Sequence, residues 1–120
     1  MKGKTILVVD DQKGVRKLLS ELLSREGYAV QLATNGAEAL ESVHNQVPDL
    51  ILLDNRMPGL CGLSTLRQLQ QDGVGVPVIF MTAYGDLELV QEAFDLGAVQ
   101  HMSKPFDMKG LLETIRGLIP

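Results

Sequence analysis

The sequence holds a single cysteine, Cys61, no tryptophan, two tyrosines and three phenylalanines. One cysteine excludes an internal disulfide, so the simplest reading is a reducing compartment, and we expect a cytoplasmic protein. No apolar run approaches the roughly 20 residues needed to cross a membrane. The first residues lack a signal-peptide pattern, so we expect neither a membrane span nor a leader.

Basic residues are also in the minority. The chain has 11 Lys and Arg against 15 Asp and Glu, and a formal net charge of −4. Nucleic acids and anionic membranes are bound through clustered positive charge, so neither is an expected partner. A chain of 120 residues can bury a core without disulfides or metal staples. We expect one monomeric domain over residues 1–120, with no output domain.

What the sequence does have is an alternation of short apolar runs and helical patterns. The runs at 5–9, 28–33, 50–53, 76–82 and 99–103 are typical of strands in a mostly buried sheet. Each is followed by apolar residues at helical spacing. The second of these helical patterns includes Val47. In the fourth pattern we expect four side chains to face the core, namely Leu87, Val90, Phe94 and Ala93.

Strands that alternate with helices through short connections indicate right-handed crossovers. The predicted fold is α/β: a doubly wound, flavodoxin-like (βα)5 domain whose five-stranded parallel sheet has the order 2-1-3-4-5.

Polar residues stand at the ends of the expected strands. The stretch at 48–59 shows this most sharply, because a wholly apolar run ends on Asp54 and a loop with Pro and Gly follows. Asp10 and Asp11 follow the first strand, Thr82 ends the fourth, and Lys104 follows the fifth. The carboxyl ends of parallel strands share one edge of the sheet, where open α/β folds place their ligands. We expect these side chains to lie close together.

Three carboxylates in one place repel one another, by about 4 kcal/mol for a pair at 4 Å in an effective dielectric near 20. Such a site needs a cation, and oxygen ligands favour Mg²⁺ or Mn²⁺ over zinc. The ion would let a phosphoryl group approach Asp54, while Thr82 and Lys104 contact its oxygens. Taken singly, Asp10 and Asp11 could cap a helix, Thr82 could be structural, and Lys104 could be solvated. Together they favour phosphoryl transfer.

The sequence resembles the receiver domain of two-component response regulators over essentially its whole length. The matching motifs are Val9-Asp10-Asp11, Asp54-Asn55-Arg56-Met57-Pro58 with Gly62, Thr82-Ala83-Tyr84, and Lys104-Pro105-Phe106. Cys61 and Asn55 depart from the residues usual in the family, and neither removes a required group.

The resemblance implies a role for each motif. Asp54 would accept a phosphoryl group from a phosphohistidine, so that the protein is phosphotransferase-like and catalyses its own phosphorylation. Mg²⁺ would be held by Asp10, Asp11, Asp54 and the backbone carbonyl of Arg56. Thr82 and Lys104 would read out the phosphoryl group, and the side chain of Tyr84 would follow Thr82. The peptide bond before Pro105 would be cis.

Within the family, residues 11–16, 82–85 and 104–107 resemble stand-alone receivers of the relay that controls sporulation initiation. This likeness implies a sensor histidine kinase as phosphate donor and a four-helix histidine phosphotransferase as acceptor, with aspartyl-phosphate phosphatases as further partners. The docking surface for the bundle would consist of Gln12, Gly14, Val15, Leu18, Tyr84, Pro105 and Phe106. Val15 and Leu18 could equally be core residues.

Other functions fit less well. A haloacid-dehalogenase-type phosphatase needs a second Asp two positions after the first, where this chain has Gln12. A flavin or dinucleotide carrier needs a Gly-rich loop after its first strand. A chemotaxis-like switch, which binds a target without passing the phosphate on, would use the same site residues and stays open. We expect His44 to be solvated and His101 to be a packing or interface residue.

Overall fold

The structure is a computed structural model that describes residues 3–55, 62–83, 87–104 and 107–120, without the side chains of Ala83 and Lys104. Its elements are β1 (Thr5–Val9), α1 (Lys13–Arg25), β2 (Ala29–Ala33), α2 (Gly36–Asn45), β3 (Leu50–Asp54), α3 (Gly62–Gln71), β4 (Val78–Ala83), α4 (Leu87–Asp95), β5 (Gln100–Lys104) and α5 (Met108–Leu118). Within these residues the sheet has five parallel strands in the order β2-β1-β3-β4-β5, which confirms the predicted fold.

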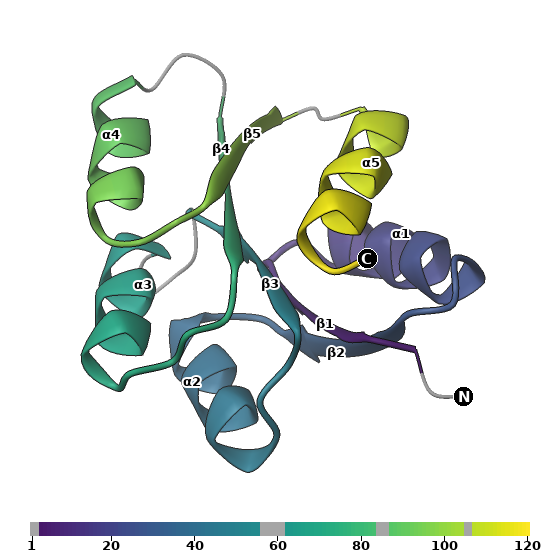
Figure 1. Ribbon diagram of the computed structural model, residues 1–120, viewed down its shortest axis with the longest axis horizontal. Helices are drawn as coiled ribbons and strands as arrows, with labels where there is room; N and C mark the ends of the chain where they lie inside the picture. Colours follow the sequence, from purple (N-terminus) through teal and green to yellow (C-terminus); the bar gives the residue numbers. More distant parts are fainter. Residues whose placement is uncertain (1–2, 56–61, 84–86, 105–106) are drawn as a thin grey trace.

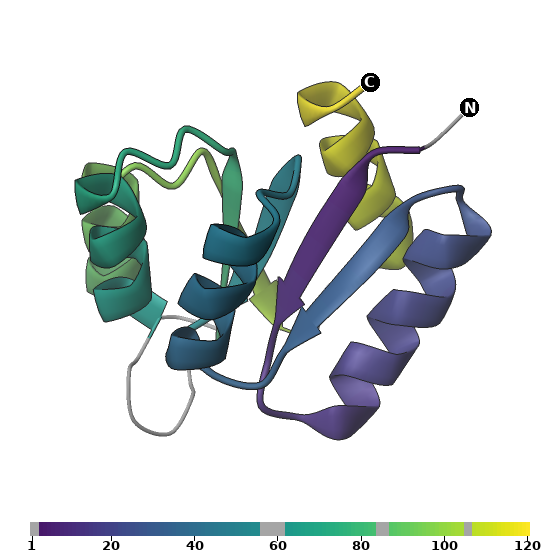
Figure 2. The same ribbon diagram turned by 90° about the horizontal axis from the view of Figure 1, so that it is seen from below.

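Helices cover both faces of the sheet. Figures 1 and 2 show α1 and α5 on one face and α2, α3 and α4 on the other. Successive residues of a strand point to opposite faces, so β1 divides its side chains between two cores. Leu7 and Val9 pack on the α2–α4 side, and Ile6 and Val8 on the α1–α5 side. The central strands β1 and β3 are therefore almost wholly apolar, as the sequence indicated.

Local signals fix where the helices begin and end. Asn35 caps α2, because its side chain accepts a hydrogen bond from the Glu38 amide at 2.9 Å. Asp107 caps α5 in the same way, accepting from the amides of Lys109 and Gly110. Gly97, with φ of 102°, follows α4 in the left-handed conformation that suits glycine. Across the described ranges, every helix is too short or too polar to span a membrane.

Two expectations about the core are wrong. On α4, Ala93 is buried, but Leu87 and Phe94 are 81% and 41% exposed. The apolar residues of this short helix surround more of its circumference than the sheet can cover, so Ala93 and the partly buried Leu89 pack against the core while Leu87 and Phe94 stay exposed. Val47 is 61% exposed, because α2 ends at Asn45 and the chain has already left the helix.

Candidate functional site

The ends of β1 and β3 bring three carboxylates together. The two strands pair in register, with Val9 opposite Leu53, so the residues that follow lie side by side. Asp10 is 0% and Asp54 4% exposed, whereas Asp11 is exposed. One carboxylate oxygen from each of the three lies within 4.8 Å of the others. The sequence predicted this cluster, and the structure places it at the expected edge of the sheet.

The cluster has the chemistry of a magnesium site. Oxygen atoms on opposite sides of a bound Mg²⁺ are about 4.2 Å apart, so the three oxygens need only a small adjustment to share one ion. Hard oxygen donors with three negative charges suit Mg²⁺ or Mn²⁺. The residues present therefore fit a divalent cation. The backbone carbonyl of Arg56, the other expected ligand, lies outside the described residues.

The turn that carries Asp10 is held by hydrogen bonds in three directions. Its amide donates to the Ala33 carbonyl at 3.1 Å, which ties the turn to β2. Its carboxylate accepts from the Gln12 amide at 2.9 Å, and its own carbonyl accepts from Arg16 Nη1 at 2.8 Å. Gln12 precedes α1 as the N-cap residue and makes no side-chain cap bond. Asp10 therefore shapes the turn before α1 and does not cap the helix.

Thr82 lies at the end of β4 and is 1% exposed. Its hydroxyl forms a 2.7 Å hydrogen bond with Nε2 of His101, on the adjacent strand β5. Partial burial lowers the pKa of His101 below its ordinary value of 6.5. A neutral imidazole follows at neutral pH, and it either accepts the hydroxyl proton or donates its own, depending on the tautomer.

This contact was missed by sequence reasoning, which gave His101 a packing or interface role. The contact between Thr82 and His101 could have been predicted from the register of β4 and β5. His101 lies opposite Phe80, two residues before Thr82, and is thus a diagonal neighbour of Thr82. His44, expected to be solvated, has an exposed side chain whose Nε2 lies 3.3 Å from Oδ2 of Asp72.

The remaining predicted site residues are described in part or not at all. Lys104 ends β5 with its backbone paired to Ala83, beside Thr82, and its side chain is not described. Tyr84, Pro105 and Phe106 lie outside the described residues, so the switch role of Tyr84 and the cis bond stay predictions.

Gly62 sits against the backbone that carries Asp54. Its amide donates to the Asn55 carbonyl at 3.1 Å. A Cβ at this position would lie 2.7 Å from the Asn55 Cα and 2.8 Å from the Asp54 carbonyl oxygen, closer than side-chain carbons approach backbone. Glycine is therefore required for α3 to begin this close to the acidic cluster.

Comparison with known proteins agrees with this geometry. The sequence profile of the response regulator receiver domain matches residues 6–116, which include every member of the acidic cluster. The chain belongs to the response regulator receiver domain family.

The relatives of this receiver domain differ in the share of their own length that this chain covers. Sporulation initiation phosphotransferase F of Bacillus subtilis (strain 168) is 42% identical over 120 residues, 100% of this chain and 97% of that protein. Response regulator MprA of Mycobacterium sp. (strain KMS) is 41% identical over 114 residues, and this chain spans 50% of its length. The structure of Vibrio cholerae chemotaxis protein CheY4 matches with a TM-score of 0.91 at 28% identity, covering 98% of this chain and 99% of that one.

The part of the expected docking surface that the structure describes lies along the start of α1 in the receiver domain. Gln12 and Gly14 are exposed, and Leu18 is 50% exposed. Val15 is half-buried and packs against the α1–α5 core. Leu18 is therefore not a core residue, and Val15 is partly one. In the part of the chain that the structure describes, half of the Leu18 surface is open to a partner.

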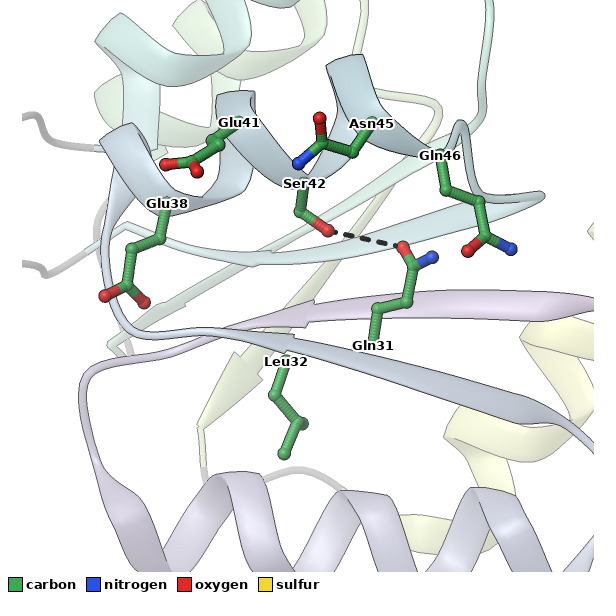
Figure 3. A pocket seen from close by; sticks show the side chains of 7 residues that line it. All are labelled: Gln31, Leu32, Glu38, Glu41, Ser42, Asn45 and Gln46. Carbon is green, nitrogen blue, oxygen red and sulfur yellow. Dashed lines mark hydrogen bonds between the residues drawn. The ribbon is translucent and has the colours of Figure 1, made fainter.

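A separate open pocket of about 510 Å³ lies over β2 and α2, at the outer edge of the sheet. Figure 3 shows its polar lining, in which the Ser42 hydroxyl donates to the Gln31 side chain at 3.4 Å. The pocket shares no residue with the acidic cluster. The pocket is therefore separate from the candidate site at the carboxyl ends of β1 and β3.

Proposed function

We propose that this protein is a phosphorelay intermediate. Asp54 accepts a phosphoryl group from a sensor histidine kinase and passes it to a four-helix histidine phosphotransferase, in the control of sporulation initiation. The observation that carries the proposal is the cluster of Asp10, Asp11 and Asp54 carboxylates within 4.8 Å of one another. Similarity to sporulation initiation phosphotransferase F along nearly the full length of both chains supports the relay role.

The chemistry is an in-line displacement at phosphorus. A carboxylate oxygen of Asp54 forms the new P–O bond as the P–N bond of the donor phosphohistidine breaks, and the leaving imidazole keeps the electron pair and takes a proton from solvent. Asp10, Asp11 and Asp54 would hold Mg²⁺, which neutralises charge on the cluster and on the phosphoryl oxygens. Onward transfer reverses the step: a histidine nitrogen of the acceptor attacks the aspartyl phosphate.

Thr82 and Lys104 are assigned to the transferred group. The Thr82 hydroxyl donates to a phosphoryl oxygen, and the Lys104 ammonium pairs with another. In the His101 tautomer whose Nε2 accepts the Thr82 hydroxyl proton, at an oxygen–nitrogen distance of 2.7 Å, Thr82 must first leave His101. Phosphorylation therefore shifts a pre-existing equilibrium between two positions of this side chain, and Tyr84 follows.

The relay needs two docking events on one surface. Gln12, Gly14, Val15 and Leu18, with Tyr84, Pro105 and Phe106, would receive the helical bundle of the phosphotransferase. The exposure of Leu18 supports this assignment. The kinase and aspartyl-phosphate phosphatases would approach the same edge, because their chemistry also occurs at Asp54. We propose a monomeric cytoplasmic receiver over residues 1–120.

A chemotaxis-like switch is the second candidate. Its support is the match to chemotaxis protein CheY4 over nearly all of both chains. Such a protein is phosphorylated on the same aspartate but binds a target and does not hand the phosphate on. The site residues are shared, so only the fate of the phosphoryl group separates the two functions.

A transfer assay with radiolabelled phosphate tests the proposal. A phosphorylated histidine kinase, this protein and a four-helix histidine phosphotransferase are mixed with Mg²⁺, beside an Asp54→Asn control of the same size. Label that enters wild type and then moves to the phosphotransferase establishes the relay. Label that enters and stays favours the switch. No uptake, even from a small phosphoramidate, would show that the assignment of Asp54 is wrong.

A further inference from the structure

Arg16 reaches back from the start of α1 to the acidic cluster. Its guanidinium Nη1 donates to the carbonyl oxygen of Asp10 at 2.8 Å. That carbonyl belongs to the peptide group that joins Asp10 to Asp11, two of the three clustered acids. The side chain is half-buried, so it lies along the β1–α1 turn and does not extend into solvent.

Asp11 is the member of the cluster that most needs such a restraint. The Asp10 carboxylate is buried and accepts from the Gln12 amide, whereas Asp11 is exposed. Within the described part of the chain, no hydrogen bond holds the Asp11 side chain. Its backbone sets the direction of the Cα–Cβ bond, and the carboxylate then rotates about two side-chain torsions. The orientation of the Asp10–Asp11 peptide, which Arg16 holds, therefore limits the positions that the Asp11 carboxylate can reach.

A positive charge beside a cation site has an electrostatic cost, and Glu38 is a carboxylate that interacts with this charge. Hydrogen bonds from the Thr34 amide and hydroxyl, both 2.7 Å, lower the pKa of Glu38, and the charge of Arg16 lowers this pKa further. Glu38 is thus a firmly ionised carboxylate in the field of the guanidinium. Because Glu38 is exposed, water screens this interaction, and most of the Arg16 charge still acts on the cluster.

We propose that Arg16 is a positioning residue for the divalent cation. It orients the Asp10–Asp11 peptide so that the Asp11 carboxylate faces Asp10 and Asp54, and this orientation raises the affinity of the cluster for Mg²⁺. The inference rests on the proposed function in one respect, which is that the cluster binds this ion. Groups that orient metal ligands typically change metal affinity by about 10- to 100-fold when they are removed.

The two effects of Arg16 have opposite signs, and this makes the inference testable. If only its charge mattered, Arg16→Met would bind Mg²⁺ more tightly, because a repulsive cation is gone. If it positions Asp11, the same substitution weakens binding, by about tenfold at the lower end of the expected range. Arg16→Lys keeps the charge but replaces the planar fork by a single ammonium, so we expect an intermediate loss.

Isothermal titration of the full chain with MgCl2 at constant ionic strength measures these constants, and thermal unfolding confirms that each variant is folded. Lys17→Met is the matched control, since it removes a neighbouring exposed positive charge that makes no hydrogen bond to the turn among the described residues. Its Kd should stay unchanged or fall slightly. If Arg16→Met does not fold, Arg16→Lys gives the decisive comparison. An unchanged or lower Kd in the folded Arg16 variant overturns the inference.

Phosphorylation from a small phosphoramidate adds a second readout. A positioning role predicts that Arg16→Met needs more Mg²⁺ for half-maximal rate but approaches the wild-type rate at saturating Mg²⁺. A deficit that saturation does not repair would contradict it. Wild type that binds no Mg²⁺ at all would overturn the proposed metal site itself, whereas equal binding by wild type and Arg16→Met would overturn only the role of Arg16.

Discussion

The ends of β1 and β4 both deliver a buried polar residue to the same edge of the sheet, but they hold it differently. Asp10 at the end of β1 is fixed through its amide, its carboxylate and its carbonyl, each with a separate partner. The hydroxyl of Thr82 at the end of β4 bonds to one imidazole at 2.7 Å.

This difference matches the role that we propose for each end. Metal ligands must keep one geometry, because Mg²⁺ demands near-ideal octahedral coordination. A residue that reports phosphorylation must have two positions of similar free energy, so that a new contact can move it from one to the other. One exchangeable hydrogen bond provides this, and three bonds in different directions do not.

We expect the largest effect from a substitution in the acidic cluster at the end of β1. Asp11→Asn removes one of three ligand charges and should weaken Mg²⁺ binding about a hundredfold or more, since a single charge pair at 4 Å is worth about 4 kcal/mol at an effective dielectric near 20. Calorimetric titration measures the change. Asp49→Asn is the matched control at the opposite end of β3, where Oδ2 accepts from the Thr5 amide at 2.7 Å. Equal loss of Mg²⁺ affinity in both variants would contradict the site assignment.

The second prediction disturbs β3, the strand between these two ends. Gly62→Ala forces a methyl group against the backbone of Asp54 and Asn55. We expect the free energy of unfolding, measured with urea, to fall by about 1–3 kcal/mol. Gly117→Ala is the control, because a Cβ there meets nothing within 4 Å and helical alanine is favoured by up to about 1 kcal/mol. Unchanged stability in Gly62→Ala would show that the close approach carries no strain.

The third prediction concerns the hydrogen bond between Thr82 and His101 at the end of β4. His101→Phe removes the partner that holds the Thr82 hydroxyl, so the hydroxyl is free to meet the phosphoryl group. A hydrogen bond contributes about 0.5–1.5 kcal/mol net, and the initial rate of phosphorylation by a small phosphoramidate should rise about 2- to 10-fold. In the Thr82→Val background the same substitution should give no gain. A wild-type rate in His101→Phe would mean that the bond does not restrain Thr82.

The smallest effect is a pH dependence at the same end. Because burial lowers the pKa of His101, the unfolded chain binds more protons than the folded one between the folded-state pKa and about 6.5. The free energy of unfolding should therefore rise with pH through that window and fall as the solution is acidified. Urea unfolding between about pH 5 and 8 measures the slope, which should be shallower in His101→Gln. Parallel curves for the two proteins would contradict this.

The strands and the acids at their ends were predicted from local signals, whereas the sheet order came from the fold class that alternating strands and helices indicate. The run from Leu50 to Leu53 is short, wholly apolar and bounded by turn residues, which favours a buried strand, and a carboxylate directly after such a strand lies at the edge of the sheet. Asp10 and Asp11 repeat the pattern at β1. Once parallel strands are assumed, their ends must share an edge, and the clustering of the three acids follows without knowledge of any contact.

The features that were missed depend on contacts between distant parts of the chain. His101 meets Thr82 only because β5 pairs with β4 in one register, and a shift of one residue would turn His101 to the other face. His44 meets Asp72 across α2 and the end of α3, 28 residues apart. On α4 the apolar residues do recur at helical spacing. The part of the helix circumference that the sheet covers, however, is set by the assembled fold and not by the sequence of α4.

The strand order also has a consequence for the newly made chain. In the described sheet β5 pairs only with β4, at one edge, whereas β1 lies between β2 and β3. A single domain generally folds as a unit. Leu111 and Ile115 of α5 belong to the same core as Ile6 and Val8 of β1 and Leu50 and Leu52 of β3, so these early strands complete their packing only after α5 has been synthesised. The acidic cluster is encoded in the first half of the chain, but we expect it to form only when the last helix is available.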